Sequence, residues 1–169
     1  FYYNYPTNTL TKVLNVDENA TNREFSPKGL ALAYTIDNNL FVQDSNDKTL
    51  QVTNDENNTI INGQAVHRYE FGISKGTFWS NNGHKLAFYK KDESMVSDYP
   101  LVNTNTRIAE ANIIKYPMAG MTSHHVTVGV YDLKDKQIIY LKTGEPKEQY
   151  LTNITWGPND KYIYIAVLN

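Results

Sequence analysis

The sequence predicts an all-β fold and, within that class, a partial β-propeller of about three blades, each of four antiparallel strands. First, its Tyr, Val, Ile and Thr residues, including 13 tyrosines, fall in short and often alternating stretches, as strands require. Second, no segment keeps a helical apolar period for three turns, and residues 107–111 supply one turn at most. Third, strand–turn–strand units recur along the chain, which a sandwich or jelly roll does not require.

The composition fits one globular domain and excludes several functions. With 169 residues, 40% of them hydrophobic and 20% charged, the chain can bury a core. A net charge of −2 and just three arginines argue against nucleic acid as a partner. The absence of cysteine excludes disulfides, thiolate metal sites and cysteine nucleophiles. There is no membrane-spanning apolar run and no signal-like leader, and because the chain opens on Phe1 we expect a piece of a larger protein.

Two repeated units define the blades. The first is an aromatic residue, a turn rich in Pro, Asn or Gly, and an apolar strand, with the turn residues suited to the backbone angles of a reversal. It occurs at residues 25–34, 79–88 and 156–165. The second is a strand, an Asp-x-x-Asp-Lys turn and a strand, at residues 41–52 and 129–140. Its recurrence indicates that the acidic run beginning at Asp44 is a hairpin turn and not a calcium loop, which would need a central Gly and a distal Glu.

The spacing of these units places the blades and an insertion. Phe25 and Trp79 are 54 residues apart, whereas Asp44 and Asp132 are 88 apart, so 34 extra residues lie between Tyr89 and His125. We expect the following segments: a blade remnant at 1–22, a blade at 23–53, a connecting substrate loop at 54–76, a blade at 77–143 with an inserted arm at 90–124, and half a blade at 151–169. Closed propellers need four to eight blades, so these segments form an arc.

Several motifs in this order resemble the N-terminal propeller of the dipeptidyl peptidase IV family. They are Trp79-Ser80, residues 86–89, 92–94, 99–101, 116–120 and 126–131. Within the family, residues 66–80 and 143–148 are most similar to the bacterial prolyl tripeptidyl peptidase branch. The similarity covers essentially the whole chain.

The resemblance implies a proline-specific serine exopeptidase. Such enzymes pair an eight-bladed propeller with a C-terminal α/β-hydrolase domain that carries the catalytic Ser, Asp and His, so no catalytic residue is expected in this chain, and no cofactor. They release short peptides from substrates with a free N-terminus. The resemblance also implies a bacterial, exported enzyme, periplasmic or at the cell surface. The propeller would gate the active site.

Glu70 is the candidate substrate-binding residue. An exopeptidase must recognise the α-ammonium of its substrate, and a carboxylate does so through a charge-assisted hydrogen bond. Glu70 lies in a long, weakly strand-like segment between two blades, and such loops often carry function. From composition alone, a solvated surface glutamate is the commoner interpretation. The resemblance favours the anchor, although dipeptidyl peptidases carry two adjacent acids here and this chain has Tyr69-Glu70. The single carboxylate favours tripeptide release.

The inserted arm is a candidate interface. Its apolar side chains, among them Tyr99, Leu101, Ile108, Ile113 and Met118, exceed what a hairpin can bury against its own edge. The alternative is an arm folded back over the propeller face. The resemblance implies a homodimer that uses residues 92–122.

Two further patterns are weak. Residues 72–76 match G-x-S-x-G around Ser74, followed in order by Asp92 or Asp98 and by His124 or His125, but a nucleophile elbow needs a buried strand before the Ser and a helix after it. We therefore interpret Ser74 as a loop serine. His124 and His125 are adjacent and would point to opposite faces of a strand, while His67 and His84 are isolated, so no metal site is expected.

A second class of function stays open: a propeller used purely for binding or as a scaffold, since a fold alone does not fix a function. A hydrolase domain encoded downstream would favour the peptidase, whereas a chain that stops after one ring of blades would favour the scaffold.

Overall fold

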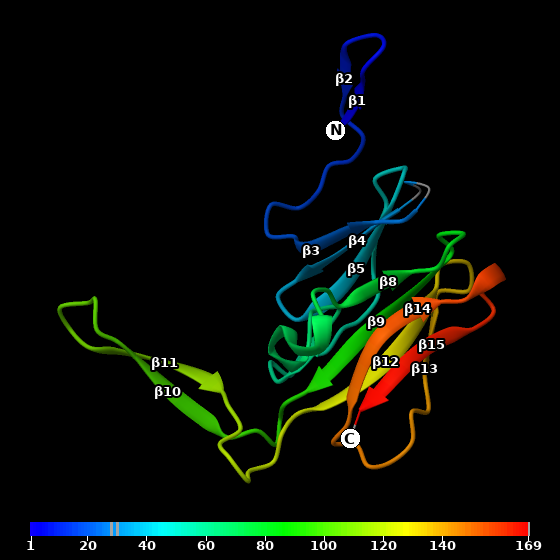
Figure 1. The fold of residues 1–169 in the computed structure, drawn as a ribbon. Helices are drawn as coiled ribbons and strands as arrows, with labels where there is room; N and C mark the ends of the chain where they lie inside the picture. The colour runs from blue at the N-terminus through cyan, green and yellow to red at the C-terminus, as the bar shows by residue number, and fades with distance from the viewer. Residues whose placement is uncertain (28, 30, 169) are drawn as a thin grey trace.

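The computed structural model describes residues 1–27, 29 and 31–168 and confirms the all-β, partial-propeller prediction. Lys28, in the first turn motif, and Asn169, at the end of the expected half blade, lie outside the described residues. The antiparallel sheets stand one behind another, and two hairpins project from them (Figure 1). Those hairpins are β1 (Tyr2–Asn4) with β2 (Thr9–Thr11), and β10 (Asp98–Asn103) with β11 (Glu110–Lys115).

The first complete sheet has four strands in simple up-and-down order. They are β3 (Thr21–Phe25), β4 (Ala31–Ile36), β5 (Asn39–Asp44) and β6 (Thr49–Gln51). The turn between β5 and β6 is closed by the Asp44 carboxylate, whose Oδ1 accepts the backbone N–H groups of Asn46 and Lys48 at 2.8 and 3.0 Å. The acidic run is thus a hairpin turn, as its recurrence indicates.

The second sheet contains one strand that the sequence did not reveal. It consists of β7 (Ile60–Asn62), β8 (Thr77–Trp79), β9 (Lys85–Asp92), β12 (His125–Asp132) and β13 (Gln137–Tyr140). β7 and β8 both pair with the same edge of β9, β7 with its last three residues and β8 with residues in its first half. The expected connecting loop at 54–76 is therefore not wholly a connection, because residues 60–62 belong to this sheet.

The third sheet is the hairpin of β14 (Tyr150–Trp156) and β15 (Ile163–Leu168), joined through a short 3-10 turn, η2 (Pro158–Asp160). β14 begins one residue earlier than the half blade expected at 151. Among the described residues, no helix has both the length and the apolar character needed to cross a membrane.

The core lies between the sheets, and β9 is buried on both of its faces. Leu86 and Phe88 join the cluster shared with the first sheet, while Ala87 and Tyr89 join the cluster shared with β14. Successive side chains of a strand point to opposite faces, so a strand between two sheets must be apolar throughout. This explains the unbroken run Leu86–Tyr89, all four of which are 1% exposed or less.

The second and third copies of the first repeat each contact the preceding copy through the indole of their tryptophan. The Trp79 indole donates to the backbone oxygen of Glu24 at 3.1 Å, and the Trp156 indole donates to that of Phe78 at 2.8 Å. In both cases the acceptor is the residue just before the aromatic of the previous repeat. The fourth residue after each aromatic has positive φ: Gly29 (64°), Gly83 (77°) and Asp160 (54°).

Asp160 departs from glycine at that position and uses its side chain to bridge two sheets. Its Oδ1 accepts the backbone N–H of Asn81 at 2.7 Å and the Asn81 amide at 2.8 Å, and its Oδ2 accepts the backbone N–H of Asn82 at 2.9 Å. Burial would raise the pKa of Asp160, but these hydrogen bonds outweigh it and the pKa is lowered from its ordinary value.

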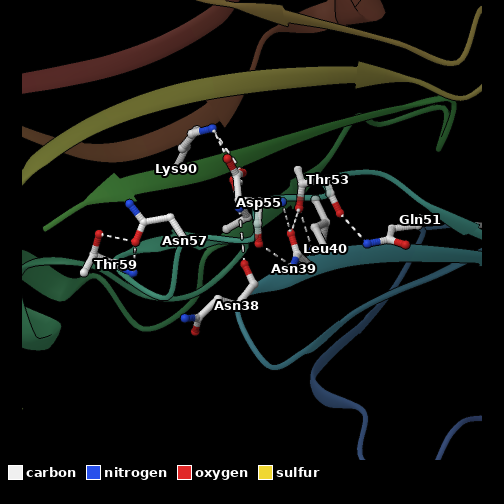
Figure 2. Close-up of polar contacts among 10 residues, drawn as sticks. Asn38, Asn39, Leu40, Gln51, Thr53, Asp55, Asn57, Thr59 and Lys90 are labelled. Carbon is white, nitrogen blue, oxygen red and sulfur yellow. Dashed lines mark hydrogen bonds and ion pairs between the residues drawn. The ribbon is translucent and has the colours of Figure 1, made fainter. Parts of the chain in front are cut away.

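A polar network joins the first and second sheets at the opposite end of the strands (Figure 2). The Asp55 carboxylate accepts from Lys90 Nζ at 3.0 and 3.1 Å and from the Asn62 amide at 2.9 Å. The backbone N–H of Asp55 donates to Asn39 Oδ1 at 2.9 Å. Three independent links therefore hold the sheets in register: indole bonds, the Asp160 bridge and this Asp55 network.

Candidate functional site

Glu70 lies on an excursion that interrupts one strand of the second sheet. The backbone N–H of Gly63, just after β7, donates to the oxygen of Tyr89 at 2.8 Å, and the N–H of Tyr89 donates to the oxygen of Gly76, just before β8, at 3.0 Å. β7 and β8 are thus one edge strand, and residues 64–75 leave and re-enter it at a single residue of β9. The two ends come so close that a Cβ on Gly76 would lie 2.2 Å from the Gln64 backbone, which is why glycine is needed there.

The excursion contains the short 3-10 segment η1 (His67–Gly72), whose backbone is unusual. Four of its non-glycine residues, His67, Arg68, Tyr69 and Phe71, have φ between 51° and 64°. Glu70 alone is extended, at φ −71° and ψ 165°. Left-handed backbone costs an ordinary residue about 1 kcal/mol or more, and such strain gathers at functional sites.

Buried residues fix both ends of this segment and leave Glu70 at its apex. Val66 and Ile73 are 2% and 5% exposed and belong to the core cluster that contains Tyr89 and Leu151. Between them, Glu70 is exposed, and within the described residues it has no ion-pair partner. The sequence-predicted residue is therefore a free carboxylate held out from a firmly anchored loop.

Aromatic rings surround the segment. The Tyr150 ring, at the start of β14, lies 4.7 Å from the His67 ring and 4.8 Å from the Phe71 ring, measured between centroids. The Arg68 guanidinium lies 4.5 Å above the ring of Tyr116, at the base of the arm. This contact keeps the positive charge of Arg68 on the arm, and attraction of a cation to a ring face stabilises it there.

His67 is not isolated, contrary to the expectation from sequence. Its Nδ1 lies 3.1 Å from Nε2 of His124, just before β12, and its own Nε2 is buried with no hydrogen-bond partner among the described residues. Burial, with the charges of His124 and Lys91, lowers the pKa of His67 from 6.5 to about 4. Burial and Lys91 also lower the pKa of His124. Both imidazoles are neutral near pH 7, so the contact between them is a hydrogen bond between two uncharged rings.

His125 and the question of a metal site are the remaining points about the histidines. His125, the first residue of β12, pairs with Glu148 at 3.1 Å and not with its neighbour His124. In the part of the chain that the structure describes, no three His, Asp or Glu side chains are grouped to hold a metal ion.

Ser74 lies exposed between η1 and β8, so a strand follows it where a nucleophile elbow has a helix. Three of the residues that follow Ser74 in the order of a catalytic triad contact other side chains: Asp98 contacts Lys115, His124 contacts His67, and His125 contacts Glu148.

The arm extends away from the sheets (Figure 1). It begins after Asp92, where β9 ends, and not at residue 90 as expected. Its base is anchored, because Val96 is 3% exposed and Lys115 Nζ donates to the Val96 oxygen at 3.0 Å. Its strands carry the exposed apolar side chains of Leu101, Val102 and Ile113, and the turn between them carries that of Ile108.

Sequence reasoning missed Tyr89 and Tyr150. Tyr89 holds both ends of the excursion with its backbone, and its hydroxyl donates to the Leu151 oxygen at 2.6 Å, next to Tyr150. Burial raises the pKa of Tyr89 to about 12, which keeps this donor protonated. In the sequence, both tyrosines looked like ordinary strand packing residues, and no local signal distinguishes them.

Comparison with known proteins gives a consistent answer. The model of the dipeptidyl peptidase IV (DPP IV) N-terminal region matches residues 1–169. Dipeptidyl aminopeptidase B of Saccharomyces cerevisiae is 33% identical over 147 residues, which cover 80% of this chain and 18% of the yeast protein.

Two solved structures share the fold. A Bacteroides ovatus chain provisionally assigned as a dipeptidyl aminopeptidase IV superposes with a TM-score of 0.85 and 46% identity, over 99% of this chain and 23% of that one. Porphyromonas gingivalis dipeptidyl peptidase 4 gives 0.79 and 30%, over 87% and 22%. This chain thus spans about a fifth of the length of these proteins. They bear dipeptidyl names, so the tripeptidyl branch stays a prediction. As the sequence motifs indicated, the chain belongs to the dipeptidyl peptidase IV N-terminal region family.

Proposed function

We propose that this chain is the propeller portion of a proline-specific serine exopeptidase, and that Glu70 binds the N-terminal ammonium of its peptide substrates. One observation carries the proposal: Glu70 is an exposed carboxylate without an ion-pair partner among the described residues, at the apex of an anchored and strained excursion. A free carboxylate can accept charge-assisted hydrogen bonds from a substrate ammonium. The exposed rings of Tyr69 and Phe71 flank it and offer apolar walls.

The rest of the active site belongs to the C-terminal α/β-hydrolase domain of the full-length protein, with its Ser, Asp and His. In this arrangement the propeller gates access, and Glu70 sets how far the free N-terminus lies from the catalytic serine. With one carboxylate and Tyr69 in place of a second acid, we propose release of tripeptides over dipeptides. We also propose that the enzyme is bacterial and exported, to the periplasm or the cell surface.

The arm supports a further part of the proposal, a homodimer that uses residues 92–122. Its exposed apolar side chains would be buried against the partner's arm or hydrolase domain, since a two-fold interface is self-complementary. Anchoring at its base through Val96 keeps the arm extended.

The test of the amine anchor is Glu70→Gln in the full-length protein, with Glu56→Gln, another exposed glutamate, as the matched control. We expect kcat/KM for an Ala-Ala-Pro-chromophore substrate to fall about tenfold or more, because losing a charged hydrogen-bond partner costs about 1.5–3 kcal/mol. N-acetylated substrates should be poor for the wild type and little changed by the substitution. Equal hydrolysis of free-amine peptides by wild type and Glu70→Gln would overturn the assignment, and a comparison with Ala-Pro substrates tests the peptide length.

A further inference from the structure

The segment that presents Glu70 has a strained backbone. Two backbone hydrogen bonds bracket the turn around Glu70, from the Tyr69 N–H to the Val66 oxygen at 3.2 Å and from the Ile73 N–H to the Glu70 oxygen at 3.1 Å. Against these stand four left-handed residues, which favour a different backbone. Contacts from outside the segment must therefore stabilise the observed shape.

Tyr150 supplies such contacts on both sides of Glu70. Its ring lies 4.7 Å from His67, at the first residue of η1, and 4.8 Å from Phe71, directly after Glu70. The two ring pairs are tilted by 59° and 58°, within the range of favourable aromatic contacts. One side chain of a neighbouring blade thus touches the start and the end of the turn that presents the carboxylate.

The position of Tyr150 is itself well defined. The adjacent residue, Leu151, is fully buried, and its oxygen accepts the Tyr89 hydroxyl at 2.6 Å. Tyr89 also pairs with both ends of the excursion. The His67 ring is also held by the imidazole of His124, whose Nε2 lies 3.1 Å from His67 Nδ1. The groups facing this pair are Lys91, Glu93 and His125, and none of them reaches Glu70 in an ion pair.

We propose that Tyr150 is a positioning residue, which holds the η1 turn through its ring contacts with His67 and Phe71 and so fixes where Glu70 meets the substrate ammonium. This inference rests on the proposed function of Glu70. Tyr150 touches no substrate; its hydroxyl is not needed, and its ring is.

The experiment uses the full-length protein and steady-state kinetics with free-amine and N-acetylated Ala-Ala-Pro-chromophore substrates. Tyr150→Ala should raise KM for the free-amine substrate about three- to tenfold, the size expected for losing two aromatic contacts. The rate at which a fluorophosphonate labels the catalytic serine should not change, because that reaction needs no amine anchor. Tyr150→Phe keeps the ring and should restore KM. Tyr5→Ala, at an exposed tyrosine of the N-terminal hairpin, is the matched control.

A double-substitution cycle separates this inference from the proposed function. If Tyr150 acts through Glu70, Glu70→Gln with Tyr150→Ala should be no weaker than Glu70→Gln alone. The positioning role would be overturned if the reductions in kcat/KM caused by the two substitutions multiplied in the double variant. It would also be overturned if Tyr150→Ala reduced kcat/KM equally for free-amine and N-acetylated substrates. No effect of Glu70→Gln by itself would instead overturn the proposed function. Should Tyr150→Ala fail to fold, Tyr150→Leu, which keeps an apolar side chain but removes the ring, tests the same two ring contacts in the same cycle.

Discussion

Replacing Asp160 by alanine should loosen the contact between the second and third sheets. The carboxylate accepts three hydrogen bonds from Asn81 and Asn82, at 2.7 to 2.9 Å. Hydrogen bonds to a charged acceptor contribute about 1.5–3 kcal/mol each when fully buried. At this sheet junction water can replace part of each bond, so we take about 1 kcal/mol for each and expect the free energy of unfolding to fall by about 3 kcal/mol.

Tryptophan fluorescence during urea unfolding is a suitable assay, because both tryptophans lie at junctions between sheets. With a urea dependence of about 2 kcal/mol per M, the midpoint of Asp160→Ala should fall by about 1.5 M. Asp160→Asn keeps one acceptor oxygen but turns an amide N–H₂ toward a backbone N–H, and should lose about half as much. Asp135→Ala, an exposed residue of the β12–β13 turn, is the control. A midpoint for Asp160→Ala within about 0.2 M of the wild type would refute the reasoning.

The same carboxylate gives a pH dependence with a definite sign. Its pKa in the folded chain lies below the ordinary 3.8, so the unfolded chain binds the proton more readily. Its stabilising contribution is complete above the unfolded pKa and is lost as the pH falls through the folded pKa. The gap in midpoint between wild type and Asp160→Ala should therefore narrow in acid.

Three other outcomes are expected. The pKa of His67 is about 4 in the folded chain against an ordinary 6.5, so the free energy of unfolding should fall by up to about 3 kcal/mol as the pH drops from 6.5 to 4. The urea midpoint should fall less over this pH range in His67→Asn than in the wild type. An equal dependence of the midpoint on pH in the two proteins would contradict the burial argument. Replacement of 92–122 in the full-length protein by a short Gly/Ser linker should yield monomers by light scattering, and a folded dimer with an unchanged dissociation constant would exclude the arm from the interface. This chain alone should not hydrolyse Ala-Ala-Pro-chromophore, and turnover that Ser74→Ala abolishes would contradict our interpretation of Ser74.

The fold could be predicted because its signals are local. The turns at 25–29, 79–83 and 156–160 repeat the same residue types, and each sets off a strand at the same distance. Residues whose role depends on distant partners could not be found this way. β7 is only three residues long, and the excursion at residues 64–75 separates it from β8 and β9, so neither its length nor its neighbours in the sequence predict a strand.

The site was predictable in part for the same reason. Glu70 could be proposed because it is the one acidic residue between Asn62 and Gly76 and because the family resemblance favours an amine-binding carboxylate there. The contact between His67 and His124 joins residues 57 positions apart, and Tyr150 reaches the site from the next blade. Spacing in the sequence does not predict such long-range contacts, because they depend on how consecutive sheets pack against each other.

The meeting of Gly63 and Gly76 at Tyr89 has a consequence for how this family can diversify. Since the excursion starts and finishes at one rung of the ladder, β9 keeps the same partners whatever the number of residues in between. The pairing of β9 is thus encoded by β7, β8 and the two flanking glycines, outside the stretch that carries Glu70. Residues 67–72, between the buried anchors Val66 and Ile73, can therefore differ in length between relatives without changing the pairing of β9.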